Sequence, residues 1–214
     1  MRNRTHGKSK LNIIFDLDGT LIDSKLRLYN LFSELVPLSE LSFDSYWNLK
    51  RRGIGHEVIL KDYFYYTHRD YQGFQNKWLS LIESSAYLAL DTKINNVHRV
   101  LEDCNGQFFL HLCTARQLRD AAISQLKRLD LHDYFVNILV TENKISKSDL
   151  IRQNVNLEPE DWMVGDTGHD VLAGKSLNIQ TCSVTSGFLG KESLLKYGPD
   201  KFIGSISELI AVVR

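Results

Sequence analysis

Cysteine, proline and methionine are scarce in this chain, and neither sign of charge is in excess. Its 214 residues include three cysteines, three prolines and two methionines, and 26 basic residues are balanced by 26 acidic ones. Cys104, Cys113 and Cys182 have no CxxC spacing and the seven histidines are dispersed, so neither a disulfide framework nor a zinc site is expected. Cys113 and Cys182 lie in apolar runs, where a thiol packs like a small apolar side chain. A reducing, cytoplasmic location is therefore predicted.

Long apolar runs and blocks of like charge are also missing. No run approaches the roughly 20 apolar residues that span a bilayer, and the basic stretch from Met1 to Lys10 lacks the apolar segment of a secretory signal. A net charge of zero argues against a protein that binds nucleic acid by neutralising many phosphates. We therefore expect a globular protein with a loose basic tail and no membrane or nucleic-acid partner. The sequence does not indicate an oligomeric state.

What the chain does contain is a series of short apolar runs that end in polar residues or glycine, a pattern typical of buried parallel strands. Five strands are predicted, at residues 11–15, 108–113, 135–140, 162–164 and 179–184. Helices are predicted over 147–154 and over 116–129, where one face carries Leu118, Ala122, Leu126 and Leu129. This alternation predicts a doubly wound α/β fold with a parallel sheet and helices on both faces.

A helical insert separates the first strand from the second. Residues 24–90 carry apolar side chains at helical spacing, for example Leu28, Leu31, Phe32 and Leu35. We therefore expect a core domain of residues 10–23 and 91–214 and a small α-helical cap domain of residues 24–90. The aromatic side chains of the insert are predicted to form its core, with a ligand-stacking surface as the alternative; they are Tyr63, Phe64, Tyr65, Tyr66 and Trp78.

The sequence Asp16-Leu17-Asp18-Gly19-Thr20 comes directly after the first predicted strand. Carboxylates at i and i+2 beyond a strand end can converge on one ligand, and Gly19 permits a tight turn that brings the backbone close to the substrate. One carboxylate can be the nucleophile and a metal ligand while the other transfers protons. Phosphoryl transfer needs charge neutralisation, and Mg²⁺ prefers oxygen ligands of this kind. The alternative is an ordinary turn, because Asp and Gly are common turn residues.

Polar residues also follow the later strands. Thr114 ends the second strand, where its hydroxyl and the amide of Ala115 can donate to a phosphate. Lys147 begins a helix after the third strand, and Asp166 and Asp170 follow the fourth. Each has a structural alternative, as a helix cap or a solvated side chain. Their order along the chain is informative, because ligands of open α/β sheets bind at the carboxyl ends of the strands.

Taken together, these motifs resemble those of the haloacid dehalogenase (HAD) superfamily, in its phosphoglycolate-phosphatase-like branch. The matching positions are Asp16 to Thr20, Thr114, Lys147 and the GDxxxD motif from Asp166 to Asp170, so the resemblance covers nearly the whole chain. It implies a Rossmann-like, five-stranded parallel core in which the strands ending at Asp16 and Asp166 are neighbours, with a helical cap inserted after the first motif. It also implies a Mg²⁺-dependent phosphatase that acts on a small phosphorylated metabolite.

The resemblance further implies a role for each motif residue. Asp16 would attack the phosphorus, and Asp18 would protonate the leaving group and then activate water. Thr114 and Lys147 would hold the phosphoryl oxygens. The ligands of Mg²⁺ would be Asp16, the backbone carbonyl of Asp18, and Asp166, with Asp170 as a direct or water-mediated partner.

Two positions depart from the usual motifs. Lys147 is followed by Ser148 where the family often has proline, and Lys144 lies one turn earlier, so Lys147 is preferred but Lys144 stays an alternative. Arg116 has no fixed role in the family, and both a substrate contact and a surface salt bridge are open. Two other functions are considered: a phosphomutase of the same branch, and a non-catalytic module that binds a phospho-ligand or a protein. The paired carboxylates argue against the binding module, which would not need the second one.

The insert contains one basic, glycine-containing stretch, from Lys50 to Glu57. Its two glycines suit a turn between helices, and by resemblance such a loop approaches the active site. Arg51, Arg52 and His56 are therefore candidates for contacting the part of the substrate remote from phosphorus, where arginine favours an anionic group. The alternative is a solvated turn whose arginines pair with surface acids.

Overall fold

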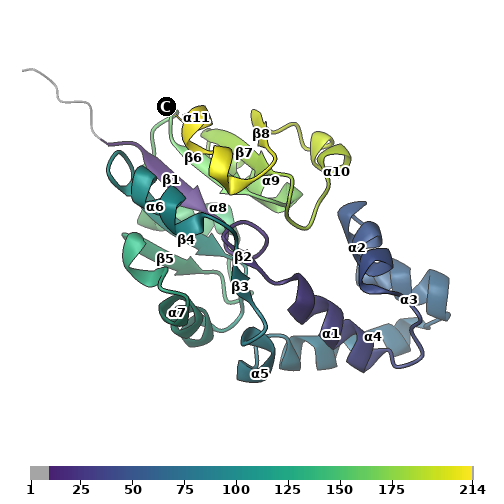
Figure 1. Ribbon diagram of the computed structural model, residues 1–214. Coiled ribbons are helices and arrows are strands. Elements are labelled where there is room, and N and C mark those ends of the chain that lie inside the picture. Colours follow the sequence, from purple (N-terminus) through teal and green to yellow (C-terminus); the bar gives the residue numbers. More distant parts are fainter. Residues whose placement is uncertain (1–9, 214) are drawn as a thin grey trace, which may run out of the picture.

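A computed structural model of the chain describes residues 10–213; most of the predicted basic tail lies outside this range. A parallel sheet covered by helices forms one part of the molecule, and a lobe of helices lies beside it (Figure 1). The sheet has the strand order β5-β4-β1-β6-β7-β8, and every neighbouring pair is parallel. The strands are β1 (Asn12–Phe15), β4 (Phe109–Thr114), β5 (Asn137–Val140), β6 (Trp162–Gly165), β7 (Gln180–Val184) and β8 (Lys201–Ile203).

The doubly wound α/β prediction is confirmed, and all five predicted strands are present. As expected, β1 and β6 are neighbours. The count of five strands is wrong, because β8 adds a sixth at the edge of the sheet beside β7. Only Ile203 of its three residues is buried, so β8 shows no continuous apolar run that a pattern search would find.

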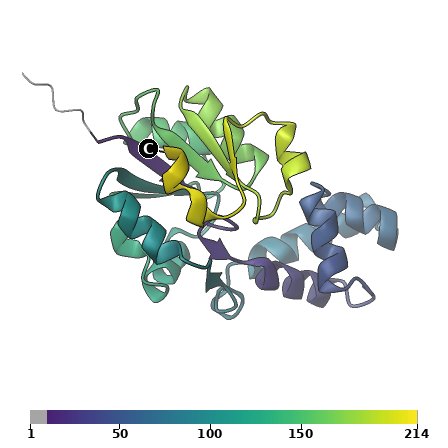
Figure 2. The same ribbon diagram turned by 45° about the horizontal axis from the view of Figure 1, so that its top comes forward.

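Side chains of β1 alternate between two apolar cores, one on each face of the sheet. Ile13 and Phe15 belong to the core formed with α6 (Val97–Asn105), α7 (Arg119–Arg128) and α11 (Ile210–Val213). Ile14 belongs to the core on the other face, beside α8 (Lys147–Asn154), with α9 (Gly168–Ser176) packed on β6 and β7. The short α10 (Lys191–Leu195) follows β7 (Figure 2). Burial on both faces explains the continuous apolar runs of the central strands.

The helix predicted over 116–129 begins later, at Arg119. Leu118 is not on its buried face but before its first turn, with 52% of its surface exposed. The carboxylate of Glu83 accepts hydrogen bonds from the backbone N–H groups of Gln117 and Leu118, both at 2.9 Å, and so holds this segment outside the helix. The predicted helix over 147–154 is present as α8.

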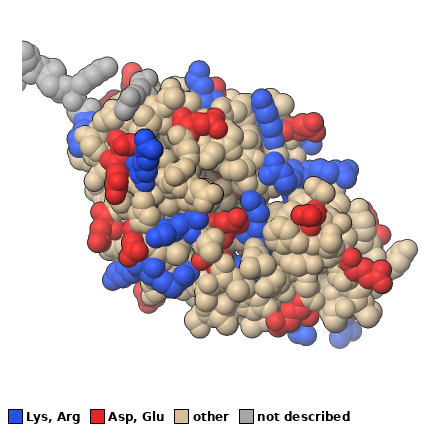
Figure 3. Space-filling view, in the orientation of Figure 1, with Lys and Arg blue, Asp and Glu red and all other residues tan. Residues whose placement is uncertain are grey.

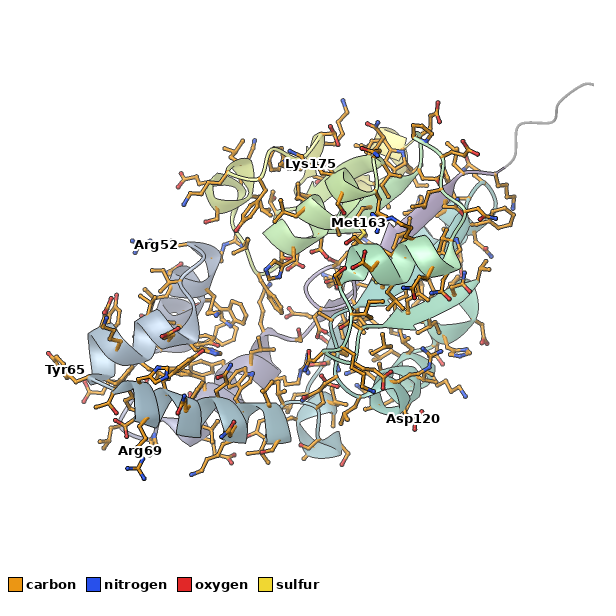
Figure 4. All side chains as sticks on the ribbon, turned by 180° about the vertical axis from the view of Figure 1, so that it is seen from behind. Arg52, Tyr65, Arg69, Asp120, Met163 and Lys175 are labelled. Atoms are coloured by element: carbon orange, nitrogen blue, oxygen red, sulfur yellow. The ribbon has the colours of Figure 1, made fainter. Side chains whose placement is uncertain are left out.

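The helical lobe consists of α1 (Lys25–Leu35), α2 (Phe43–Arg51), α3 (His56–Phe64), α4 (His68–Leu81) and α5 (Ser85–Leu88). Its core is largely aromatic, with Phe32 in contact with the rings of Tyr46 and Phe74. The prediction for the aromatic cluster is partly wrong. Phe64, Tyr66 and Trp78 pack against this core, whereas Tyr63 is 50% exposed and Tyr65 is 87% exposed. Tyr65 ends α3 in a left-handed backbone conformation, which turns its side chain away from the lobe (Figure 4).

Two short strands connect the lobe to the sheet domain. β2 (Ile22–Asp23) and β3 (Thr92–Lys93) pair in antiparallel fashion, so the chain leaves and re-enters the sheet domain at the same place. Charged side chains of both signs are interspersed over the surface in Figure 3, in keeping with the zero net charge. No helix formed by residues 10–213 combines the length and the apolar character needed to cross a bilayer.

Candidate active site

The predicted motif residues meet at the carboxyl ends of the strands. Asp16 follows β1, Thr114 is the last residue of β4, Asp166 follows β6, and Lys147 begins α8. Asp16, Asp18, Thr114, Ala115 and Lys147 line one cleft of about 910 Å³ between the sheet domain and the helical lobe. A cleft of this size is within the range of small-molecule sites.

Three buried carboxylates cluster at the base of the site, which we call its floor; Asp16 lines the cleft, whereas Asp166 and Asp170 are not among its lining residues. One oxygen each from Asp16, Asp166 and Asp170 lies within 4.8 Å of the others. Lys147 is the cation among them, with its Nζ 2.5 Å from Oδ1 of Asp16 and 2.6 Å from Oδ1 of Asp170. Lys144, the alternative from the sequence, also borders the cleft, but it is exposed and lies 3.5 Å from Glu142. The structure thus brings Lys147, and not Lys144, to Asp16.

The electrostatics of this floor follow from burial and from the crowding of like charges. Burial, opposed by Lys147 and reinforced by Asp170, raises the pKa of Asp16 to about 7. Burial and the neighbouring carboxylates also raise the pKa of Asp166 well above its usual value. Burial alone would lower the pKa of Lys147, but Asp16 and Asp170 raise it above its usual value, so the Lys147 side chain is protonated. One ammonium does not balance three carboxylates, and this oxygen-only donor set fits a hard divalent cation such as Mg²⁺.

Asp166 and Asp170 are each held in place by hydrogen bonds. Oδ2 of Asp166 accepts from the backbone N–H of Phe188 at 2.6 Å. Oδ2 of Asp170 accepts from the backbone N–H of Thr167 at 3.0 Å and from its hydroxyl at 2.7 Å, closing a capping box at the start of α9. The cap role that competed with a site role for Asp170 is therefore real, and the other oxygen of the same carboxylate still contacts Lys147.

Gly19 is required by the geometry of the turn after β1. Its φ of 81° is in the left-handed region, and a Cβ at this position would lie 2.1 Å from Oδ2 of Asp166. Any side chain here would therefore displace a carboxylate of the site as well as strain the backbone. The close approach that the sequence suggested for Gly19 is thus an approach to Asp166.

Asp18 does not join the carboxylate cluster but is held by two arginines. Nε and Nη2 of Arg116 donate to its two oxygens, at 2.6 and 2.8 Å, and Nη2 of Arg27 also donates to it. Burial would raise the pKa of Asp18, but Arg116 and Arg27 hold it well below its usual value. Behind the arginines, the buried Asp91 accepts from Nε of Arg27 at 3.0 Å and from the side-chain amide of Gln125 at 2.7 Å.

This network decides one of the two alternatives for Arg116. Its side chain is buried and paired with Asp18, so it is not a surface salt bridge. It also lines the cleft, and its Nη1 has no hydrogen-bond partner among the described residues, so a substrate contact stays a prediction. Arg27, Asp91 and Gln125 were missed altogether. They come from α1, from the residue before β3 and from α7, and no local motif links them. The one sequence signal for Asp91 is its position where the chain returns from the helical lobe, directly before β3.

The three candidates from the lobe do not line the cleft. Arg51 donates to backbone carbonyls of Thr185 and Gly187, at 3.0 and 3.1 Å. Arg52 is exposed at the end of the lobe and points away from the molecule (Figure 4). His56 is packed inside the lobe, with its ring 4.4 Å from that of Trp78 and its Nε2 2.8 Å from the hydroxyl of Tyr46. The stretch does form the turn between α2 and α3, but within residues 10–213 its arginines form no ion pair with an acid.

Comparison with known proteins agrees with this geometry. Residues 13–184 match the model of the haloacid dehalogenase-like hydrolases. The chain belongs to this family. It is 28% identical to pyrophosphatase PpaX of Bacillus pumilus, over 94% of this chain and 95% of the relative. It is 26% identical to PpaX of Halalkalibacterium halodurans, with the same coverage of 94% and 95%. The prediction of an enzyme of the HAD-like phosphatase group is thereby confirmed.

Solved structures of this family share the fold. The hydrolase SP0104 of Streptococcus pneumoniae superimposes with a TM-score of 0.78 at 24% identity, over 96% of this chain and 99% of that one. A protein described as a predicted phosphoglycolate phosphatase from Haemophilus somnus gives a TM-score of 0.75 at 18% identity, over 96% and 98%. YfnB of Bacillus subtilis, crystallised with magnesium, gives 0.67 at 18% identity, over 97% and 100%. At these identities the likeness concerns the fold alone.

Proposed function

We propose that this protein is a Mg²⁺-dependent phosphatase that hydrolyses a small phosphorylated metabolite through an aspartyl-phosphate intermediate on Asp16. The observation that carries the proposal is the pairing of Asp16 with Lys147, which both line an open cleft, beside the buried carboxylates of Asp166 and Asp170. A buried carboxylate in this position can attack a phosphorus atom from the strand end. The segment 24–90 would serve as the cap of the core domain, and the three buried cysteines suit a cytoplasmic location.

In the first half of the reaction, an oxygen of Asp16 bonds to phosphorus while the ester oxygen of the leaving group departs. The hydroxyl of Thr114, the amide of Ala115 and the ammonium of Lys147 would hold the phosphoryl oxygens. Asp16, Asp166 and the backbone carbonyl of Asp18 would hold Mg²⁺, with Asp170 as a further partner. The bound ion would neutralise the charge of the transferred group.

Asp18 would transfer the protons. In the second half of the reaction it would take a proton from the water that hydrolyses the aspartyl phosphate, and its ionised state suits this step. To protonate a leaving group it must first carry a proton, which requires that it separate from Arg116 and Arg27. The proton gained from water in one turnover would then serve the leaving group of the next.

The proposal is tested by measuring phosphate release from a panel of phosphate monoesters and inorganic pyrophosphate, with Mg²⁺ and with excess chelator. Asp16→Asn should abolish release and should remain folded, and the exposed Asp149→Asn provides the matched control. Acid-quenched reactions should contain a phosphate on Asp16, detected by mass spectrometry. Turnover by the Asp16→Asn protein, or full activity in chelator, would reject the mechanism.

A further inference from the structure

The wall of the cleft that faces the sheet domain comes from the helical lobe. The residues of this wall are Arg27, Leu28, Trp78, Ile82 and Glu83. Its chemistry decides which leaving groups the site can accommodate, because the phosphoryl group itself would occupy the carboxylate floor.

The two charged residues of the wall are already engaged. Arg27 is buried, and its three nitrogens donate to Asp91, to the carbonyl of Ile82 and to Asp18. Glu83 is also buried, and its two oxygens accept the backbone N–H groups described above. Both side chains are therefore anchored to the protein, Arg27 through three of its five N–H groups and Glu83 through both of its oxygens.

What remains of the wall is apolar. Leu28 comes from α1, and Trp78 and Ile82 are four residues apart at the end of α4, so they share one face. α1 and α4 pack against each other. The indole of Trp78 packs against the rings of Phe74 and His56, with centroid distances of 5.6 and 4.4 Å. These ring contacts fix the position of the Trp78 side chain in the wall.

Building on the phosphatase function proposed above, we propose that Leu28, Trp78 and Ile82 form a subsite for an apolar leaving group. The substrate would be an organic phosphate monoester whose alcohol portion carries an apolar surface, rather than inorganic pyrophosphate. A second phosphate against these three apolar side chains would lose hydration without gaining a hydrogen bond from them, which is costly. An apolar group would gain by leaving water.

The competing reading comes from the opposite wall. Lys144 of the sheet domain also lines the cleft, and its contact with Glu142 is a long, exposed one of 3.5 Å. It is an exposed cation of the cleft and is able to meet a second phosphate. Pyrophosphate is also the substrate named for the PpaX relatives. The two readings predict opposite responses to substitution of Lys144 and of the apolar wall.

The experiment compares kcat/KM for 1-naphthyl phosphate and inorganic pyrophosphate in the full-length protein with Mg²⁺. Each variant is expressed relative to wild type on the same substrate, so the intrinsic reactivities of the substrates cancel. Trp78→Ala should lower kcat/KM for 1-naphthyl phosphate about tenfold or more, and Leu28→Thr about threefold, with pyrophosphate changed by less than about twofold. Leu79→Ala, on the same helix but outside the cleft and 42% exposed, is the control and should change neither.

Equal losses on both substrates, or none on 1-naphthyl phosphate, would overturn the subsite. So would a Lys144→Ala variant that loses pyrophosphate hydrolysis while the wall variants behave like wild type. If Trp78→Ala unfolds the lobe, Leu28→Thr still tests the subsite. Circular dichroism measures whether each variant is folded. Calorimetric binding of 1-naphthyl phosphate in chelator gives a second readout that should weaken in both variants. Wild-type protein that binds this ester but releases no phosphate from any substrate would reject the proposed function and leave the subsite standing.

Discussion

The guanidinium of Arg51, in the helical lobe, donates to the backbone carbonyl of Gly187, in the sheet domain, at 3.1 Å. The carbonyl of Arg51 in turn accepts from the amide of Gly190 at 2.9 Å and from the hydroxyl of Ser193 at 3.0 Å. Phe188, which follows Gly187 in this loop, donates its backbone N–H to the carboxylate of Asp166, and its ring stacks on that of Trp47 in α2. The helical lobe therefore has a second contact with the sheet domain, separate from the β2–β3 connection (Figure 1). This contact is with the loop after β7, whose backbone donates a hydrogen bond to Asp166, a candidate metal ligand.

Arg51→Ala should loosen this fastening. The carbonyls of Thr185 and Gly187 would lose their partners, and we expect the free energy of unfolding in urea to fall by about 1–3 kcal/mol. Because the loop also positions Asp166, the Mg²⁺ concentration for half-maximal activity should rise about 3- to 10-fold. Arg52→Ala, at the exposed neighbouring residue, is the control and should match wild type in both measurements. An Arg51→Ala protein as stable as the control would show that the contact contributes nothing.

Asp18→Asn should lower kcat by roughly 10²–10⁴-fold, the usual contribution of a positioned acid and base. The loss should be smaller for esters with very good leaving groups, which need little protonation. The measurement is kcat across a series of phenyl phosphates with different leaving-group pKa values. A loss that does not vary across the series would mean that Asp18 acts through structure and not through proton transfer.

Arg116→Met should destabilise the fold more than a surface arginine would. It removes one of the two cations that neutralise Asp18 and the buried Asp91, and breaking a buried pair on one side costs about 3–5 kcal/mol. Arg119→Met, three residues later and exposed, is the matched control. Urea unfolding followed by circular dichroism provides the free energies. Equal stability of the two variants would show that the network is not important for folding.

His56 should make the stability depend on pH. Burial, and then the nearby charge of Lys50, lower its pKa well below the usual value of about 6.5, so below that pH the unfolded chain binds a proton that the folded protein does not. The free energy of unfolding should therefore fall as the pH drops, by about 2 kcal/mol from this residue between pH 7.5 and 5.

His56→Phe keeps an aromatic ring in the lobe but removes this titration and the hydrogen bond to Tyr46. The variant should be less stable than wild type at pH 7.5, and the difference should shrink toward pH 5. His68→Phe, at an exposed position, should keep the wild-type pH dependence. Urea unfolding at the two pH values measures both effects, and parallel curves for wild type and His56→Phe would contradict the assignment.

The sheet and the floor of the site could be predicted from sequence because their signals are local. A buried parallel strand needs an unbroken apolar run, and its last residue faces the ligand crevice, so Asp16, Thr114 and Asp166 are marked by the runs that precede them. Lys147 is marked by its place at the start of a helix. The edge strand β8 was missed because one buried residue in three gives no such run.

Only the tertiary structure decided how the charges pair. Asp18 and Arg116 are 98 residues apart, Arg27 and Asp91 are 64 apart, and Arg51 meets a carbonyl 136 residues away. Ion pairs and hydrogen bonds of this range depend on how the helical lobe packs on the sheet, and they leave no periodicity in the chain. For the same reason the sequence determined only that Arg51 and His56 lie at a turn between helices. The packing of the lobe decided that Arg51 binds the backbone carbonyls of the loop after β7 and that His56 packs inside the lobe.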